Sequence, residues 1–150
     1  MSTNIEAAVE DAYKRITYHM DPWHKSHRRH HSIAKFYLEK DERVYLAARQ
    51  SHFESITPTI ILVTNKKVLI IRPSFWKLYF GFDLLHETYV SFVPYNIIKN
   101  VNFAHGRILC SLSIKAPGVG EVIIPGLRSV TAKPILDLLE NVVEATTTTE

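Results

Sequence analysis

The sequence predicts a mainly β protein in which seven short strands form a β-barrel capped by a C-terminal helix, with a helical N-terminal extension before it. Three observations lead to this prediction. Apolar residues alternate with period two from Glu42 onward, β-branched runs flank short turns, and the final element has an apolar stripe of period 3.6. A seven-stranded antiparallel sheet must hide its edges and its apolar face, and bending it into a capped barrel achieves both.

Length and composition fit one globular domain. The 150 residues are 46% hydrophobic and 22% charged, and 18 Lys and Arg against 15 Asp and Glu give a net charge of +3. No apolar run approaches the ~20 residues that span a bilayer, and the polar N-terminus does not resemble a signal peptide. Cys110 is the single cysteine, which excludes a disulfide within the chain and a cysteine-based zinc site. We therefore expect a cytoplasmic protein.

The first predicted element is an amphipathic helix over residues 5–16. Its apolar residues form one stripe: Ile5, Ala8, Val9, Ala12, Tyr13 and Ile16. Asp21 and Pro22 end the helical region, because proline disfavours helical geometry in the residue before it. A helix of about twelve residues is marginal in water, so we expect the stripe to pack on the barrel or on a neighbouring subunit.

The elements that follow are a short helical stretch at 32–39, seven strands and a last helix. The strands are predicted at residues 44–49, 59–64, 67–71, 87–93, 97–103, 107–115 and 121–124, with Pro94 closing the fourth and Pro125-Gly126 ending the seventh. The turns at Asn65-Lys66 and Ala104–Gly106 predict two hairpins. The last helix is predicted over 130–145, where Pro134 is tolerated because it falls in the first turn.

Three segments resemble the bacterial and archaeal pleckstrin-homology (PH) domains: Leu38–Tyr45 (LEKDERVY), Ile60–Arg72 (IILVTNKKVLIIR) and Val93–Val101 (VPYNIIKNV). The resemblance covers about residues 38–143. It implies a PH-like barrel and a non-enzymatic binding or assembly scaffold. On this basis residues 1–37 are expected to form the N-terminal extension, 38–145 the PH-like domain and 146–150 a polar tail.

Nothing in the sequence predicts catalysis. Cys110 lies within a regular strand alternation and is expected to point into the core, where thiols are inert. The Gly118-x-Gly120 step lacks the third glycine of a dinucleotide loop and opens a strand rather than a helix. No Ser-His-Asp grouping and no paired carboxylates stand out. We expect no enzyme activity, cofactor or small-molecule substrate.

A basic, histidine-rich arm at residues 22–38 contains no acidic residue. Its candidate polyanion-binding residues are His24, Lys25, His27, Arg28, Arg29, His30, His31 and Lys35. His24, His27 and His31 would share one helical face and could bind zinc or copper, but the neighbouring cations and the lack of a nearby acid argue against a metal. The sequence favours an anionic partner, with a solvated arm that has no partner as the alternative.

An aromatic connection follows the third predicted strand. The candidate interaction loop comprises Arg72, Phe75, Trp76, Lys77, Tyr79 and Phe80. Aromatic rings beside cations are typical of a membrane-interface anchor and of a protein-interface hot spot. Alternatively, the rings cover the open end of the barrel or pack on the N-terminal helix.

The predicted function is therefore a non-catalytic binding module for protein–protein interaction or oligomerisation, through an exposed strand edge and the aromatic loop. The alternatives are nucleic-acid or ribonucleoprotein binding through the basic arm, and peripheral membrane association through Trp76 and its neighbours. A phosphoinositide site is disfavoured, because Gln50–Pro58 contains Glu54 and no Lys or Arg.

Overall fold

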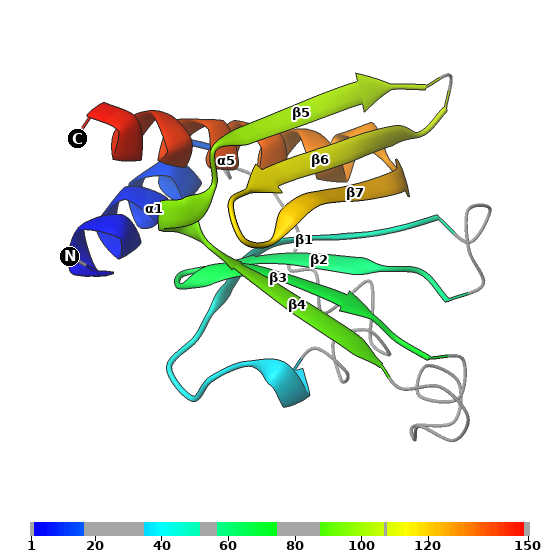
Figure 1. The fold of residues 1–150 in the computed structure, drawn as a ribbon, viewed down its shortest axis with the longest axis horizontal. Helices are drawn as coiled ribbons and strands as arrows, with labels where there is room; N and C mark the ends of the chain where they lie inside the picture. Colours follow the sequence, from blue (N-terminus) through cyan, green and yellow to red (C-terminus); the bar gives the residue numbers. More distant parts are fainter. Residues whose placement is uncertain (1, 17–34, 52–56, 75–87, 107, 149–150) are drawn as a thin grey trace.

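Two antiparallel sheets and two long helices make up the computed structural model, which describes residues 2–16, 35–51, 57–74, 88–106 and 108–148 (Figure 1). The four-stranded sheet has the order β1 (Val44–Arg49), β2 (Ile60–Thr64), β3 (Lys67–Arg72) and β4 (Tyr89–Pro94). The three-stranded sheet has the order β5 (Asn100–His105), β6 (Cys110–Ala116) and β7 (Gly120–Leu127). The 3-10 helix η1 (Tyr95–Ile97) connects the sheets, and the helices are α1 (Ser2–Ile16) and α5 (Ser129–Thr148).

The strands lie where the sequence predicted strands, and in the described residues their pairing stays within each sheet. A backbone hydrogen bond connects the two sheets at one corner, where the N–H of Ser51 donates to the carbonyl of Gly126 at 2.7 Å. The described architecture is therefore two sheets joined at a corner and covered by α5 (Figure 1).

Several element boundaries differ from the prediction by two or three residues, and the reason or the contacts at three of them are visible in the structure. β5 begins at Asn100 rather than at Ile97, because the N–H of Ile98 bonds to the carbonyl of Tyr95 and closes a 3-10 turn. β7 does not end at Pro125-Gly126 but continues to Leu127, since Gly126 takes a positive φ of 73° where the register with β6 shifts. α5 runs to Thr148, and the Thr146 hydroxyl donates to the Val143 carbonyl at 2.9 Å in its last turns. Of the short helical stretch expected at 32–39, the structure describes residues 35 onward and shows helix at 35–37.

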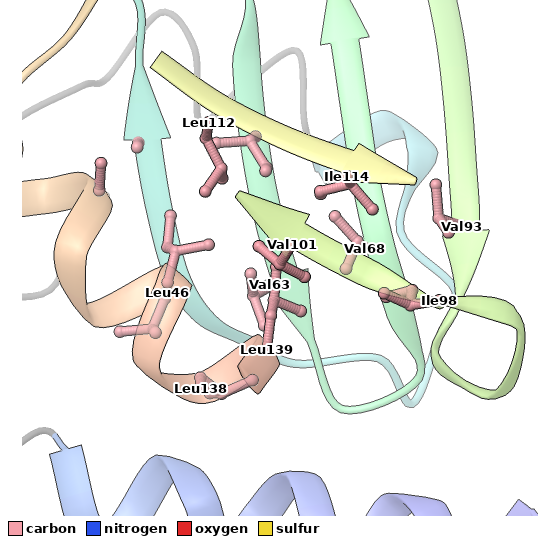
Figure 2. Packing of buried hydrophobic residues seen from close by; sticks show 14 of the residues in the cluster. Leu46, Val63, Val68, Val93, Ile98, Val101, Leu112, Ile114, Leu138 and Leu139 are labelled. Atoms are coloured by element: carbon pink, nitrogen blue, oxygen red, sulfur yellow. The ribbon is translucent and has the colours of Figure 1, made fainter. Parts of the chain in front are cut away.

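The main core lies between the two sheets and α5 (Figure 2). Alternate residues of each strand point into it, and Leu138 and Leu139 of α5 meet them from the side. α1 packs along α5 and adds Val9 and Ala12 to this core, and Tyr13 stacks on Tyr45 with the ring centroids 4.4 Å apart. The amphipathic N-terminal helix therefore packs on the body of the protein, as its stripe predicted.

A second apolar cluster covers the opposite, outer face of the four-stranded sheet. Its buried members are Ala47, Ile60, Leu62, Leu69 and Ile71, and the residues that pack on them include Tyr37, Leu38 and Val44. All five residues of β2 are consequently buried, which explains why this strand is a continuous apolar run rather than an alternation. We call this second apolar cluster the outer cluster.

Candidate functional site

The most exposed apolar strand of the described structure is β4. It is an edge strand, because within the described residues it pairs with β3 and has no second neighbour. Tyr89 is 74% exposed, Phe92 58% and Val90 36%, whereas Val93 on the same strand is fully buried. In Figure 1, β4 forms the outer margin of the four-stranded sheet on the side away from β1.

The register of β3 and β4 assigns these side chains to faces. Phe92 is paired with Leu69 and Val90 with Ile71, and opposed residues in antiparallel strands point to the same face. Phe92 and Val90 therefore extend the outer cluster to the sheet edge, where it becomes exposed. Tyr89 lies on the other face, opposite Arg72.

Within its own described residues, β4 lacks the charged side chains, bulges and central proline that usually protect a sheet edge. Natural edge strands are blunted by charged side chains, bulges or central prolines, because their unpaired backbone groups can template another strand. β4 contains no charged residue, its pairing with β3 is continuous, and its proline is the last residue, Pro94. Such an edge can accept an additional strand by backbone hydrogen bonding.

A buried polar corner ties the β2–β3 hairpin to the chain on either side of it. The carboxylate of Glu42, whose side chain is 0% exposed, accepts from the Thr64 hydroxyl at 2.5 Å, from the N–H of Glu39 at 3.1 Å and from the Lys67 ammonium at 3.1 Å. Burial raises the pKa of Glu42, but these hydrogen bonds outweigh it and hold the pKa below its ordinary value. Every group in the corner is satisfied, which is typical of a structural rather than a reactive site.

Tyr95 closes the same corner from η1. Its hydroxyl donates to the carbonyl of Thr64, and the carbonyl of Lys67 lies 3.2 Å from it. Burial raises the pKa of this phenol well above its ordinary value, so it stays a donor. Each of the three segments that carried the family resemblance thus contributes a residue to this corner.

A family model described as a bacterial PH domain matches residues 38–141. The chain belongs to this family. The match begins beside the polar corner and ends within α5, so it spans both sheets. PH-like domains are in general binding or scaffold modules for protein or lipid interactions rather than enzymes. None of the curated proteins compared with the chain matches it.

The candidate residues of the basic arm of this bacterial PH domain fall mostly outside the described residues. His24, Lys25, His27, Arg28, Arg29, His30 and His31 are among the residues that the structure does not describe. Lys35 is described and exposed, at the start of the helical stretch 35–37. Their role as a polyanion site stays a prediction.

Most candidate residues of the interaction loop also lie outside the described residues. Arg72 ends β3 and is exposed beside Tyr89, its partner in register. The other candidates, Phe75, Trp76, Lys77, Tyr79 and Phe80, lie outside the described residues. The described site and the predicted loop meet at Arg72, because the loop begins where β3 ends.

The single cysteine of this bacterial PH domain points into the core, as its strand alternation predicted. Cys110 is 3% exposed, its thiol donates to the Leu127 carbonyl at 3.2 Å, and burial raises its pKa. The reactive thiolate is therefore disfavoured. Within the described ranges, three or more metal-ligating side chains nowhere come together, and neither long helix is apolar enough to cross a membrane.

Sequence reasoning treated β4 as an ordinary strand and missed its exposed residues, Tyr89, Val90 and Phe92. A signal was nevertheless present, because residues 88–98 form a run without any charged side chain. What the run could not reveal is that β4 lies at an edge, since edge position depends on strand order.

Proposed function

We propose that this bacterial PH domain is a non-catalytic protein-interaction module, in which the two sheets act as a PH-like barrel and β4 is the strand on which a protein partner docks. The observation that carries the proposal is the uncharged edge strand with Tyr89, Val90 and Phe92 exposed. An extended segment added to this edge gains backbone hydrogen bonds and contacts to those side chains.

Of the two cations that the structure describes beside β4, Lys67 offers a polyanion little free charge, whereas Arg72 is exposed opposite Tyr89. The ammonium of Lys67 lies 5.8 Å from the centre of the Phe92 ring, but the same ammonium is paired with Glu42 at 3.1 Å. Its charge is therefore largely balanced within the protein. Nucleic-acid binding through the basic arm and membrane attachment through the aromatic loop remain the alternatives that the following experiment distinguishes.

The test compares two charge insertions at edge strands. Phe92→Lys places a charge on β4, and the matched control Ile123→Lys places the same charge on β7, where Ile123 is 50% exposed. Both variants should melt near the wild-type temperature, because exposed substitutions usually change stability by within ~0.5 kcal/mol. Tagged full-length proteins are then compared for captured protein partners, including copies of the chain itself, and for binding of RNA, duplex DNA and anionic vesicles.

We expect Phe92→Lys to reduce protein capture about tenfold or more, as loss of a central aromatic contact commonly does. Ile123→Lys should capture as the wild type does. The proposal would be contradicted if the wild type and both variants captured no protein while Phe92→Lys still bound RNA, DNA or vesicles as the wild type does. That result would favour one of the alternatives.

A further inference from the structure

We propose that the partner docked on β4 is a second copy of this chain, with the two β4 strands antiparallel about a two-fold axis through Ser91. This inference rests on the proposed function and names its partner. The two four-stranded sheets would then form one continuous eight-stranded sheet across the axis, as an isologous contact between identical surfaces allows.

Antiparallel geometry restricts where the axis can lie. Opposed residues point to the same face, so the axis must pass through a residue position and not between two. With the axis at Ser91, Val90 faces Phe92 of the second copy twice, and Tyr89 faces Val93 of the second copy twice. An axis at Val90 would instead place Tyr89 opposite Ser91, and an axis at Phe92 would place Val90 opposite Pro94.

The Ser91 register matches β4 to itself in both size and polarity. Pairs of an aromatic with a β-branched residue are among the favourable cross-strand contacts, and the exposed pair Val90–Phe92, which this register makes twice, is of this kind. Because β4 contains no charged residue, no like charges oppose each other across the axis. The other two registers oppose an apolar side chain to Ser91 or to the ring of Pro94.

The outer cluster continues across this contact. One row on the outer face runs through Ala47, Leu62, Leu69 and Phe92, and the next runs through Arg49, Ile60, Ile71 and Val90. In the proposed dimer the first row of one copy meets the second row of the other, because Phe92 faces Val90. The apolar surface that ends exposed at the edge of one copy is thereby continued by Val90, Ile71 and Ile60 of the second.

The other edges of the described sheets are less suited to this pairing. β1 carries Arg49, and a register shift interrupts its ladder between Val44 and Leu46. β7 carries Glu121, and a register shift interrupts its ladder near Pro125. β5 exposes polar side chains, including Asn100, Asn102 and His105. Prolines, bulges and polar or charged side chains are the features that discourage edge-to-edge pairing.

The size of the contact predicts a weak dimer. Tyr89 and Phe92 are 74% and 58% exposed, so with roughly 200 Å² for each aromatic side chain these two rings offer about 530 Å² for burial over both copies. This lies below the ~1,200 Å² at which standard-size protein interfaces begin. We therefore expect a dissociation constant in the micromolar range, and a monomer–dimer equilibrium that depends on concentration.

Sedimentation equilibrium of the full chain from 1 μM to 1 mM tests the association. The wild type and Ile123→Lys should show the same dimerisation, and Phe92→Lys should raise the dissociation constant by at least about tenfold, or 1.4 kcal/mol. Ser91→Lys is a second variant, because it opposes two like charges at the axis itself. A wild type that stays monomeric throughout, or variants at Phe92 and Ser91 that dimerise like the wild type, would overturn the proposal.

Disulfide trapping tests the register. Paired residues have Cα atoms about 4.5–5.5 Å apart, within the range that a disulfide bridges. Ser91→Cys should form a covalent dimer under mild oxidation, whereas Ser129→Cys, which is also exposed but lies at the start of α5, should not. The buried Cys110 makes the wild type a second control. Equal trapping of the two cysteine variants would refute the axis at Ser91.

The failure of this inference is distinguishable from the failure of the proposed function. If the wild type is monomeric but Phe92→Lys still loses capture of a different protein, β4 is a docking strand for that protein and the dimer is wrong. If the dimer forms and Phe92→Lys abolishes it, both the docking function of β4 and the dimer are supported.

Discussion

Replacing Glu42 by glutamine tests whether the buried polar corner holds the matching segments of the fold together. The substitution preserves the shape of the side chain and removes its charge. At present the carboxylate accepts from Thr64 at 2.5 Å, from the N–H of Glu39 at 3.1 Å and from Lys67 at 3.1 Å. Glutamine offers one acceptor oxygen in place of two and turns an NH₂ group toward donors.

The loss of stability in Glu42→Gln depends on how well Lys67 and the other hydrogen-bond partners of Glu42 are satisfied without the carboxylate. Removing one member of a buried ion pair costs about 3–5 kcal/mol when the other charge is stranded. Lys67 is not fully stranded, because its side chain is 16% exposed and Glu39 lies 3.8 Å from its ammonium. A hydrogen bond to a charged group contributes about 1.5–3 kcal/mol, so we expect Glu42→Gln to lower the free energy of unfolding by about 2–3 kcal/mol at pH 7.

Urea unfolding followed by far-UV circular dichroism measures this difference. The matched control is Asp41→Asn, which removes a neighbouring carboxylate that is 75% exposed and paired with Lys66 at 2.8 Å. Surface ion pairs contribute little, so the control should unfold at the wild-type midpoint. The slope of the transition should be unchanged in both variants, since neither alters the surface exposed on unfolding.

Acid provides a second readout with a defined sign. The pKa of Glu42 is lowered in the folded protein, so its stabilisation is present above the unfolded value near ~4.3 and is lost as the pH falls through the folded pKa. The wild type should lose its advantage over Glu42→Gln in this acidic range. The reasoning is refuted if Glu42→Gln unfolds at the wild-type midpoint at pH 7, or if the difference between the two proteins does not shrink in acid.

Two further predictions concern the N-terminal third of the chain. Deleting residues 1–20 removes Val9 from the main core, where it is 0% exposed, and should lower the melting temperature by roughly 5–10 °C; an unchanged melt would show that α1 contributes nothing to stability. Replacing Lys25, Arg28 and Arg29 by Ala should flatten the logarithmic salt dependence of duplex DNA binding by about 2.7, at about 0.9 per lost phosphate contact. Binding that is absent in the wild type, or insensitive to salt, would leave the basic arm without a polyanion role.

Strand positions, the terminal helices and the burial of Cys110 could be predicted from the sequence because each depends on local periodicity. Cys110, Leu112 and Ile114 alternate with polar residues along β6, and such an apolar face of a strand packs on a core. The segments that resemble the family were also readable, and the buried contacts of Glu42, Thr64 and Tyr95 show what they do structurally. The residues that form hydrogen bonds in the polar corner are far apart in the sequence, but each lies in one of the segments that resemble the family.

The continuation of β7 past Pro125 and the exposure of β4 could not be predicted from local periodicity. Pro125 is compatible with the strand only because β7 lies at an edge, where the missing N–H is not needed, and Gly126 allows the bulge. Phe92 and Leu69 are similar apolar residues at facing positions, yet Leu69 is 2% exposed and Phe92 58%. Local sequence determines that a residue belongs to a strand and to which face it points. Whether that strand has a neighbour on each side is decided by long-range pairing, and this alone makes β4 the exposed edge.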